Sequence, residues 1–152
     1  MKKVIITCLC ALSLWGAPYK VGQSVMPLDL SDQFGKKHAL KAMPKTLIMA
    51  FEKGTGATVN EYLAEQEKGY LAKNKAAFVA DISQMPPFIT ETFALPKMRK
   101  YPHTVLLIRD EEQGLRFPGE DGKITVMKFR GNFLTRIEFI ESAAELKKAI
   151  EQ

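Results

Sequence analysis

The hydrophobic pattern of this chain consists of short apolar runs separated by turn residues, and this predicts a β-sheet. Residues 46–51 form a continuous apolar run, which is typical of a central strand buried on both faces. Near the N-terminus a polar turn at 32–35 separates two short runs and predicts a hairpin. The predicted strands span residues 28–31, 37–40, 46–51, 76–82, 104–108, 124–129 and 133–140.

Capping signals predict where the first helix begins. Thr58 and Glu61 have the spacing of a capping box, so this helix is expected to begin at Val59. The glycine-bearing segment 53–56 is then expected to be a loop that connects the helix to the preceding strand.

Two further helices complete the pattern. The two prolines at 86–87 suit the first turn of a helix that ends near residue 96 or continues irregularly to 100. Ser142 and Glu145 form a second capping box, which opens a final helix. Strands that alternate with helices predict an α/β fold with a mixed sheet.

The N-terminus has the pattern of a secretory signal. A short positive segment precedes the apolar stretch 4–15, which falls within the ~7–15 residues of a signal and short of the roughly 20 that span a bilayer. We expect a signal peptide at 1–17, a domain at 18–152 without a membrane span, and a periplasmic location. The alternative is an uncleaved anchor on the outer face of the inner membrane. Both cysteines, Cys8 and Cys10, lie in this stretch, so the processed domain would contain none.

The charge is moderately basic, with a formal value of +5. Basic residues are spread along the chain, with small groups at 36–37 and 97–100, and no stripe of them alternates with aromatic residues. Nucleic-acid binding therefore has little support. A scaffolding role through the basic exterior remains a further interpretation. The apolar segment 85–88 is a candidate partner patch, although Phe88 itself is expected in the core.

Three segments of the chain carry a family resemblance. Residues 21–35 are similar to the hairpin pattern "G…P.F.L.D..G", and the apolar strand 46–51 is followed by a loop and a long helix. Residues 101–104, Tyr-Pro-His-Thr, precede a strand and look like a cis-proline loop. Together they resemble the thioredoxin superfamily, especially its periplasmic, peroxiredoxin-related branch. The resemblance implies a thioredoxin-like fold, with a central mixed sheet flanked by helices and an N-terminal hairpin.

The resemblance also implies where a redox site would lie. The family's Cys-x-x-Cys pair falls within 54–59, with Gly56 and Val59 at the two cysteine positions. In redox-active members a thiolate at the helix N-terminus exchanges with a disulfide, which glycine and valine cannot do. We therefore expect no thiol–disulfide oxidoreductase or peroxiredoxin activity, and no cofactor.

Without the two thiols, the resemblance still implies a groove that binds a periplasmic protein, a peptide or a small ligand. The alternative is that the proline loop persists only because the fold needs that turn. The candidate groove residues are Gly54, Thr55, Gly56 and Thr58, facing Tyr101, Pro102 and His103.

A different class of function is an enzyme without thiols in the same cleft. Glu52, Asp81 or His103 would then act as general acid or base, and Asp81 ends a predicted strand at the edge where α/β sheets place their sites. The two histidines, His38 and His103, have no further ligand at suitable spacing, so no metal site is expected.

Overall fold

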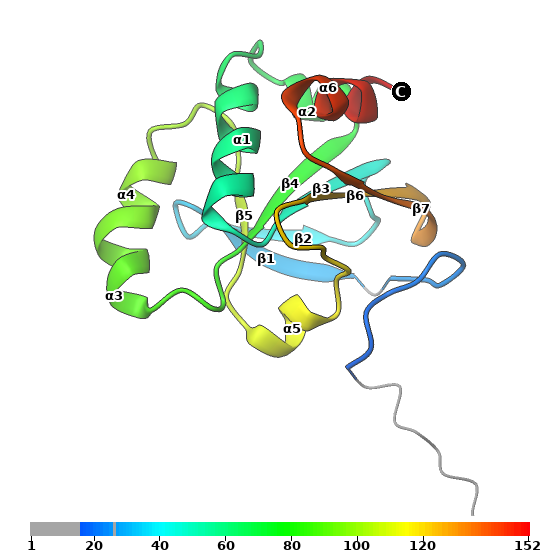
Figure 1. The fold of residues 1–152 in the computed structure, drawn as a ribbon, viewed down its shortest axis with the longest axis horizontal. Coiled ribbons are helices and arrows are strands. Elements are labelled where there is room, and N and C mark those ends of the chain that lie inside the picture. The colour runs from blue at the N-terminus through cyan, green and yellow to red at the C-terminus, as the bar shows by residue number, and fades with distance from the viewer. Residues whose placement is uncertain (1–15, 26) are drawn as a thin grey trace, which may run out of the picture.

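The computed structural model describes residues 16–25 and 27–152, which form one mixed sheet of seven strands with helices packed against it (Figure 1). The strand order in the sheet is β2-β1-β5-β4-β3-β6-β7. The strands are β1 (Leu28–Asp32), β2 (Lys37–Leu40), β3 (Thr46–Ala50), β4 (Ala76–Asp81), β5 (Leu106–Ile108), β6 (Ile124–Arg130) and β7 (Phe133–Ile140).

The helical elements lie between these strands and after the last one. They are α1 (Lys53–Ala64), α2 (Tyr70–Lys73), α3 (Pro87–Ile89), the π-helical turn η1 (Thr90–Ala94), α4 (Leu95–Met98), α5 (Glu111–Leu115) and α6 (Ala143–Glu151).

The central strands combine parallel and antiparallel pairing. β3, β4 and β5 run parallel, with Ile48 opposite Phe78 and Ala80 opposite Leu107. β6 is antiparallel to β3, and β1 is antiparallel to β5. Every residue of β3 is buried, which explains its continuous apolar sequence. The carboxyl ends of β3, β4 and β5 therefore share one edge of the sheet, and their amino ends share the other.

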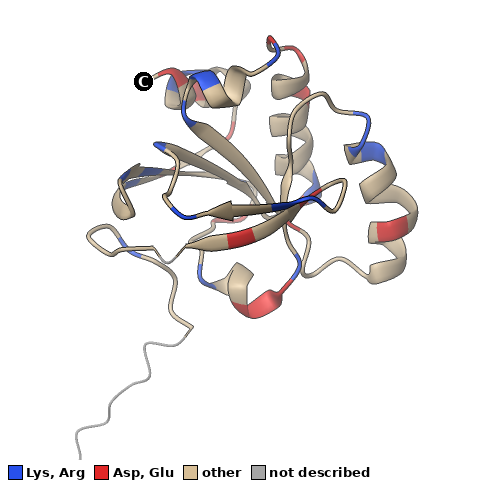
Figure 2. Cartoon of the chain, turned by 180° about the vertical axis from the view of Figure 1, so that it is seen from behind, with Lys and Arg blue, Asp and Glu red and all other residues tan. Residues whose placement is uncertain are grey.

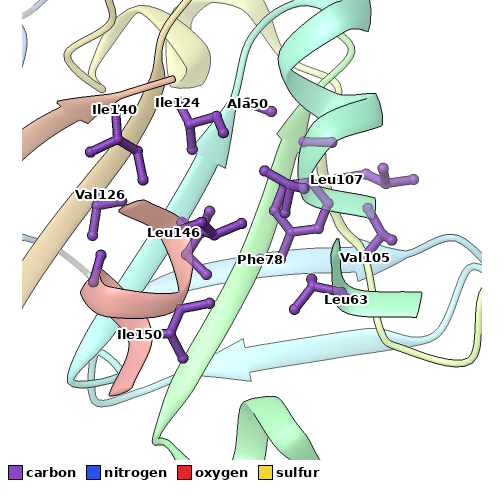
Figure 3. Packing of buried hydrophobic residues seen from close by; sticks show 14 of the residues in the cluster. Ala50, Leu63, Phe78, Val105, Leu107, Ile124, Val126, Ile140, Leu146 and Ile150 are labelled. Atoms are coloured by element: carbon purple, nitrogen blue, oxygen red, sulfur yellow. The ribbon is translucent and has the colours of Figure 1, made fainter. Parts of the chain in front are cut away.

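Alternate residues of β3 point into two separate cores, as the period of a strand requires. Ile48 belongs to a cluster with Phe78 and Leu146, to which α1, α4 and α6 contribute Leu63, Leu95 and Ile150. Figure 3 shows part of this cluster, with Phe78 near Leu63 and Leu146 near Ile150. Leu47 lies on the opposite face, in a second cluster that includes Phe117. Tyr19 and Val25, from the segment 16–25, also pack in this second cluster.

The strand predictions and the last helix are confirmed. The two hairpin strands pair antiparallel, with Leu30 opposite His38. The hydroxyl of Ser142 accepts a hydrogen bond from the Glu145 backbone N–H at 3.2 Å, and the Glu145 carboxylate accepts one from the Ser142 backbone N–H at 3.0 Å. A reciprocal capping box therefore opens α6, as the sequence predicted.

The predicted start of the first helix is wrong. α1 begins at Lys53 with Glu52 as its N-cap, so the expected loop 53–56 is its first turn. Thr58 caps nothing; its hydroxyl donates to the backbone oxygen of Gly54 at 3.2 Å, one turn earlier in the helix. The helix then ends at Ala64, and α2 begins only after Gly69, whose φ is +82°.

The segment 87–98 is helical as predicted, with the π-helical turn at its centre. The expectation that Phe88 lies in the core is wrong, because 69% of it is exposed. The residues of this segment that are buried are Thr90 and Leu95, and Phe88 packs instead against Phe93, edge to face, with ring centroids 6.1 Å apart.

The predicted signal peptide, 1–17, lies almost wholly outside the described residues. Within residues 16–25 and 27–152, no helix has the length and apolar character needed to cross a membrane.

Candidate functional site

The first turn of α1 is the position at which the family resemblance places a redox site. Gly54 and Gly56 are helical there, and the Thr55 hydroxyl accepts a hydrogen bond from the Glu52 backbone N–H at 3.3 Å. Val59 is fully buried in the core beneath the helix. Neither Gly56 nor Val59 offers a thiol or another nucleophile, and the side-chain polar groups at this end of α1 are the Glu52 carboxylate, the Lys53 ammonium and the threonine hydroxyls.

The loop that lies beside this turn was not identified from the sequence. The backbone N–H of Gly122 donates to Glu52 Oε1 at 3.0 Å. A Cβ on Gly119 would come within 3.1 Å of the Phe51 ring, so loop 118–122 lies directly against the end of β3. The signal that could have found it is topological, since this loop precedes β6, the strand antiparallel to β3.

Tyr101, Pro102 and His103 occupy the opposite edge of the sheet. They precede β5, which is parallel to β3, whereas α1 begins beyond the carboxyl end of β3. The prediction of a cis bond before Pro102 is wrong, because the described residues contain no cis peptide. Trans is the favoured isomer of an X–Pro bond by about 0.5–1 kcal/mol.

The two halves of the predicted groove are therefore separated along α1. His103 meets that helix at Asn60, in its second half, with His103 Nε2 and Asn60 Oδ1 2.8 Å apart. Gly54, Thr55, Gly56 and Thr58 lie at or near the other end of the same helix.

His103 is held as a neutral ring. Its imidazole stacks on Tyr101, with centroids 5.2 Å apart and planes 23° from parallel. Burial lowers the pKa of His103 from 6.5 to about 4. The Asn60 oxygen can only accept, so Nε2 carries the hydrogen and Nδ1 is the bare acceptor. Nδ1 is buried and has no hydrogen-bond partner within the described part of the chain.

A cleft of about 600 Å³ lies beside His103. Its walls come from β2, β4, the end of α1, the segment that joins α1 to α2, α2 itself, and the loop that leads into β5. The lining is predominantly apolar, with polar groups at a few positions, as in sites for small molecules. The residues that line the cleft include Leu40, Leu63, Leu71, Ala72, Phe78 and His103.

The candidate acid–base residues do not converge on one point. Asp81 accepts a hydrogen bond from the Ser83 backbone N–H at 2.9 Å and lies against Gly114. Glu52 accepts the Gly122 N–H, and His103 lies at the other edge of the sheet. General acid–base catalysis needs such groups within hydrogen-bond reach of one substrate, so His103 cannot act on the same substrate atom as Glu52 or Asp81, which follow β3 and end β4 at the opposite edge.

No metal centre is formed by the described residues. His38 Nε2 lies 2.7 Å from Asp32 Oδ2, and His103 Nε2 lies 2.8 Å from Asn60 Oδ1. Within residues 16–25 and 27–152, no three groups of the kind that bind metals come together.

Comparisons with known proteins show what this architecture resembles. No protein-family model and no curated protein matches the sequence. Among solved structures, it is similar to a thio-disulfide isomerase from Thermus thermophilus, with TM-score 0.54, 17% identity, and coverage of 87% of this chain and 95% of that one. It is also similar to the peroxidoxin BcpB from Mycobacterium tuberculosis, with TM-score 0.52, 16% identity, and coverage of 86% and 94%.

The structure is also similar to a SCO1/SenC family lipoprotein from Bacillus anthracis, with TM-score 0.54, 10% identity, and coverage of 89% of this chain and 98% of that one. The fold is thus thioredoxin-like, as the sequence resemblance implied. At these sequence identities the similarity establishes the fold alone. The chemistry has to be inferred from the residues of this chain.

Proposed function

We propose that this protein is a non-catalytic, exported thioredoxin-like domain that binds a ligand instead of exchanging disulfides. The support for this comes from the first two turns of α1, where the family resemblance places the two thiols at Gly56 and the buried Val59. The chain does have two cysteines, Cys8 and Cys10, but both precede the described residues. If the segment 1–17 is removed on export, the periplasmic protein has no thiol at all.

The ligand site we propose is the cleft beside His103. This proposal rests on the apolar cleft of about 600 Å³, which is lined by two of the predicted site residues, Pro102 and His103. The first turn of α1 lines a different region, next to loop 118–122. An apolar lining offers water few hydrogen-bond partners, so such sites accept apolar molecules or apolar side chains.

The non-catalytic part of the proposal is tested with an insulin-reduction assay on the full-length chain, on its Cys8→Ser/Cys10→Ser double variant, and on the processed periplasmic protein. We expect the double variant and the processed protein to show no turnover above a heat-inactivated control. Turnover by either would refute the proposal, because neither contains a thiol.

The proposed binding is tested with toluene as an apolar probe. Binding is measured as the shift in the melting temperature of the protein when toluene is added. Ala72 is exposed at the cleft, and Ala72→Trp should fill the cleft and abolish the shift. Gly54→Ala, at the far end of α1, is the matched control and should leave the probe's effect unchanged. Loss of the toluene shift in Gly54→Ala but not in Ala72→Trp would move the site to the first turn of α1.

A further inference from the structure

Two basic segments that are far apart in the sequence lie together at one corner of the molecule. Arg99, which follows α4, donates from Nε to the backbone oxygen of Gln33 at 2.9 Å. Gln33 opens the turn between β1 and β2, and this turn lies beside α4 in both views of the chain (Figures 1 and 2). Figure 2 shows basic residues in blue on both segments. We call this set the basic corner: Lys36, Lys37, Lys97, Arg99 and Lys100.

The charges of the basic corner are not neutralised within the described chain. All five side chains are exposed, and none of them forms an ion pair with another residue of 16–25 or 27–152. The carboxylate in the turn, Asp32, is buried and turned inward, where it accepts hydrogen bonds from the Phe34 and Lys36 backbone N–H groups at 2.9 and 3.0 Å.

Asp32 is nevertheless ionised at neutral pH. Burial alone would raise its pKa, but the contact with His38 and the two backbone N–H groups outweigh burial and hold the pKa below its usual value of 3.8. Its charge is taken up by backbone N–H groups of the turn and by His38, and it forms no ion pair with a side chain of the basic corner.

The tip of the same turn presents an aromatic ring to solvent. Phe34 is 62% exposed. The ring is held outward by a rigid turn, since Gly35 has a φ of +81°, which favours glycine, and the buried Gln33 anchors the turn to the loop before β5. Phe88 and Phe93 add further exposed aromatic surface on the helical segment that leads to Arg99, being 69% and 59% exposed.

We propose that the basic corner binds the surface of an anionic lipid bilayer, with Phe34 inserted among the head groups. Each Lys or Arg near an anionic membrane contributes roughly 1 kcal/mol of attraction, and aromatic side chains anchor peripheral proteins at the interface. An acidic polypeptide would also match the charge. The tip of a turn is convex, however, and a protruding phenyl ring suits insertion into a planar head-group layer better than reception of a partner's side chain.

The test uses co-sedimentation of the full chain with vesicles of phosphatidylcholine alone, or of phosphatidylcholine mixed with phosphatidylglycerol. The apolar stretch 4–15 is present in every variant, so its own contribution to vesicle binding is common to all of them. We expect tighter binding to the vesicles that contain phosphatidylglycerol, and a loss of that preference as salt is added.

Charge-reversal variants locate the binding surface. Lys97→Glu with Lys100→Glu should weaken binding to phosphatidylglycerol vesicles about 30-fold or more. Lys147→Glu with Lys148→Glu makes the same change in net charge on α6, and should weaken it less than about threefold, because most of the charge there is screened from a membrane docked at the corner. Equal losses in the two double variants would overturn the proposal in favour of bulk charge alone.

The aromatic contribution is tested separately. Phe34→Ser should weaken binding roughly fivefold, whereas Phe133→Ser, which removes an exposed ring at the β6–β7 turn, should not. Circular dichroism melts establish that the variants are folded. Polyglutamate is the competing probe: if it binds in a corner-dependent manner while phosphatidylglycerol vesicles do not, the occupant is an acidic polypeptide and the membrane proposal is wrong.

Discussion

The side-chain oxygen of Gln33 accepts a hydrogen bond from the backbone N–H of Val105 at 2.9 Å, across 72 positions of sequence. The Gln33 amide nitrogen donates to the backbone oxygen of His103 at 2.8 Å. One buried side chain therefore satisfies the backbone on both sides of Thr104 and ties the hairpin turn to the loop that carries His103. The geometry of the cleft and that of the basic corner both depend on it.

Replacing Gln33 by leucine should destabilise the fold markedly. The substitution keeps the volume but leaves the Val105 N–H and the His103 oxygen buried without partners, which costs about 2–4 kcal/mol of unfolding free energy. Denaturant unfolding measures this. Gln23→Leu is the matched control, because the hydrogen bond of Gln23 to the Lys20 N–H is exposed, and it should change stability by less than about 0.5 kcal/mol. Equal effects would mean that the Gln33 bonds are not formed.

One glycine substitution tests whether α1 begins at Lys53. A Cβ on Gly54 would meet no atom within 4 Å, so Gly54→Ala should stabilise the protein by roughly 0.5–1 kcal/mol if the residue is helical. A destabilising effect of Gly54→Ala would instead indicate the loop that the sequence predicted.

Gly114→Ala is the contrasting case in another helix. A Cβ there would lie 2.2 Å from Asp81 Oδ2, and Asp81 is held by the Ser83 N–H. Alanine should therefore displace the carboxylate and cost about 1–3 kcal/mol. A stability equal to that of the unsubstituted protein in thermal melts would show that Asp81 does not occupy this position.

The half-buried ring of His103 should give the stability of the protein a specific dependence on pH. Because burial lowers the pKa of His103 to about 4 from 6.5, the unfolded chain binds the proton more readily than the folded one. Stability is therefore lost as pH falls from 6.5 towards 4, with a slope of at most about 1.4 kcal/mol per pH unit from this residue. His103→Leu should flatten the profile of unfolding free energy in that window. Asp32 remains in both proteins, and its lowered pKa places its effect below 3.8.

The hydroxyl of Tyr70 links three helices, and its removal should be costly. It lies 2.7 Å from the Tyr62 hydroxyl and donates to Glu151 Oε1 at 3.0 Å, so it joins α2 to α1 and α6. Burial, followed by these two partners, raises its pKa. Tyr70→Phe should lower the unfolding free energy by about 1–2 kcal/mol, and Tyr62→Phe by less. A double-mutant cycle in which the two effects simply add would argue against the hydroxyl–hydroxyl contact.

The elements that the sequence predicted correctly are those with a local signal. The buried strand at 46–50 follows from an unbroken apolar run, and α6 follows from the reciprocal cap of Ser142 and Glu145. Thr58 and Glu61 carry the same spacing as a capping box, yet Thr58 lies within α1. The local pattern cannot tell a cap from a helical threonine that bonds to the preceding turn.

The site was harder to predict because it depends on long-range pairing. A proline before an apolar strand has the same local pattern whether that strand is parallel or antiparallel to β3. The pattern therefore predicted that Pro102 faces the first turn of α1, whereas it lies at the opposite edge of the sheet. Pro118 precedes the strand that does lie antiparallel to β3. Likewise, nothing local in the two basic segments shows that Arg99 reaches the backbone of Gln33.

We propose that this thioredoxin-like domain binds an apolar ligand in the cleft beside His103, at the end of α1 remote from the position where the family resemblance places a redox site. Intermolecular nuclear Overhauser effects between toluene and the methyl groups of the processed protein test it most directly. We predict contacts to Leu40, Leu63 and Leu71, which line the cleft. Contacts to Ala57 in the first half of α1, without any to these leucines, would contradict the proposed binding in the cleft beside His103.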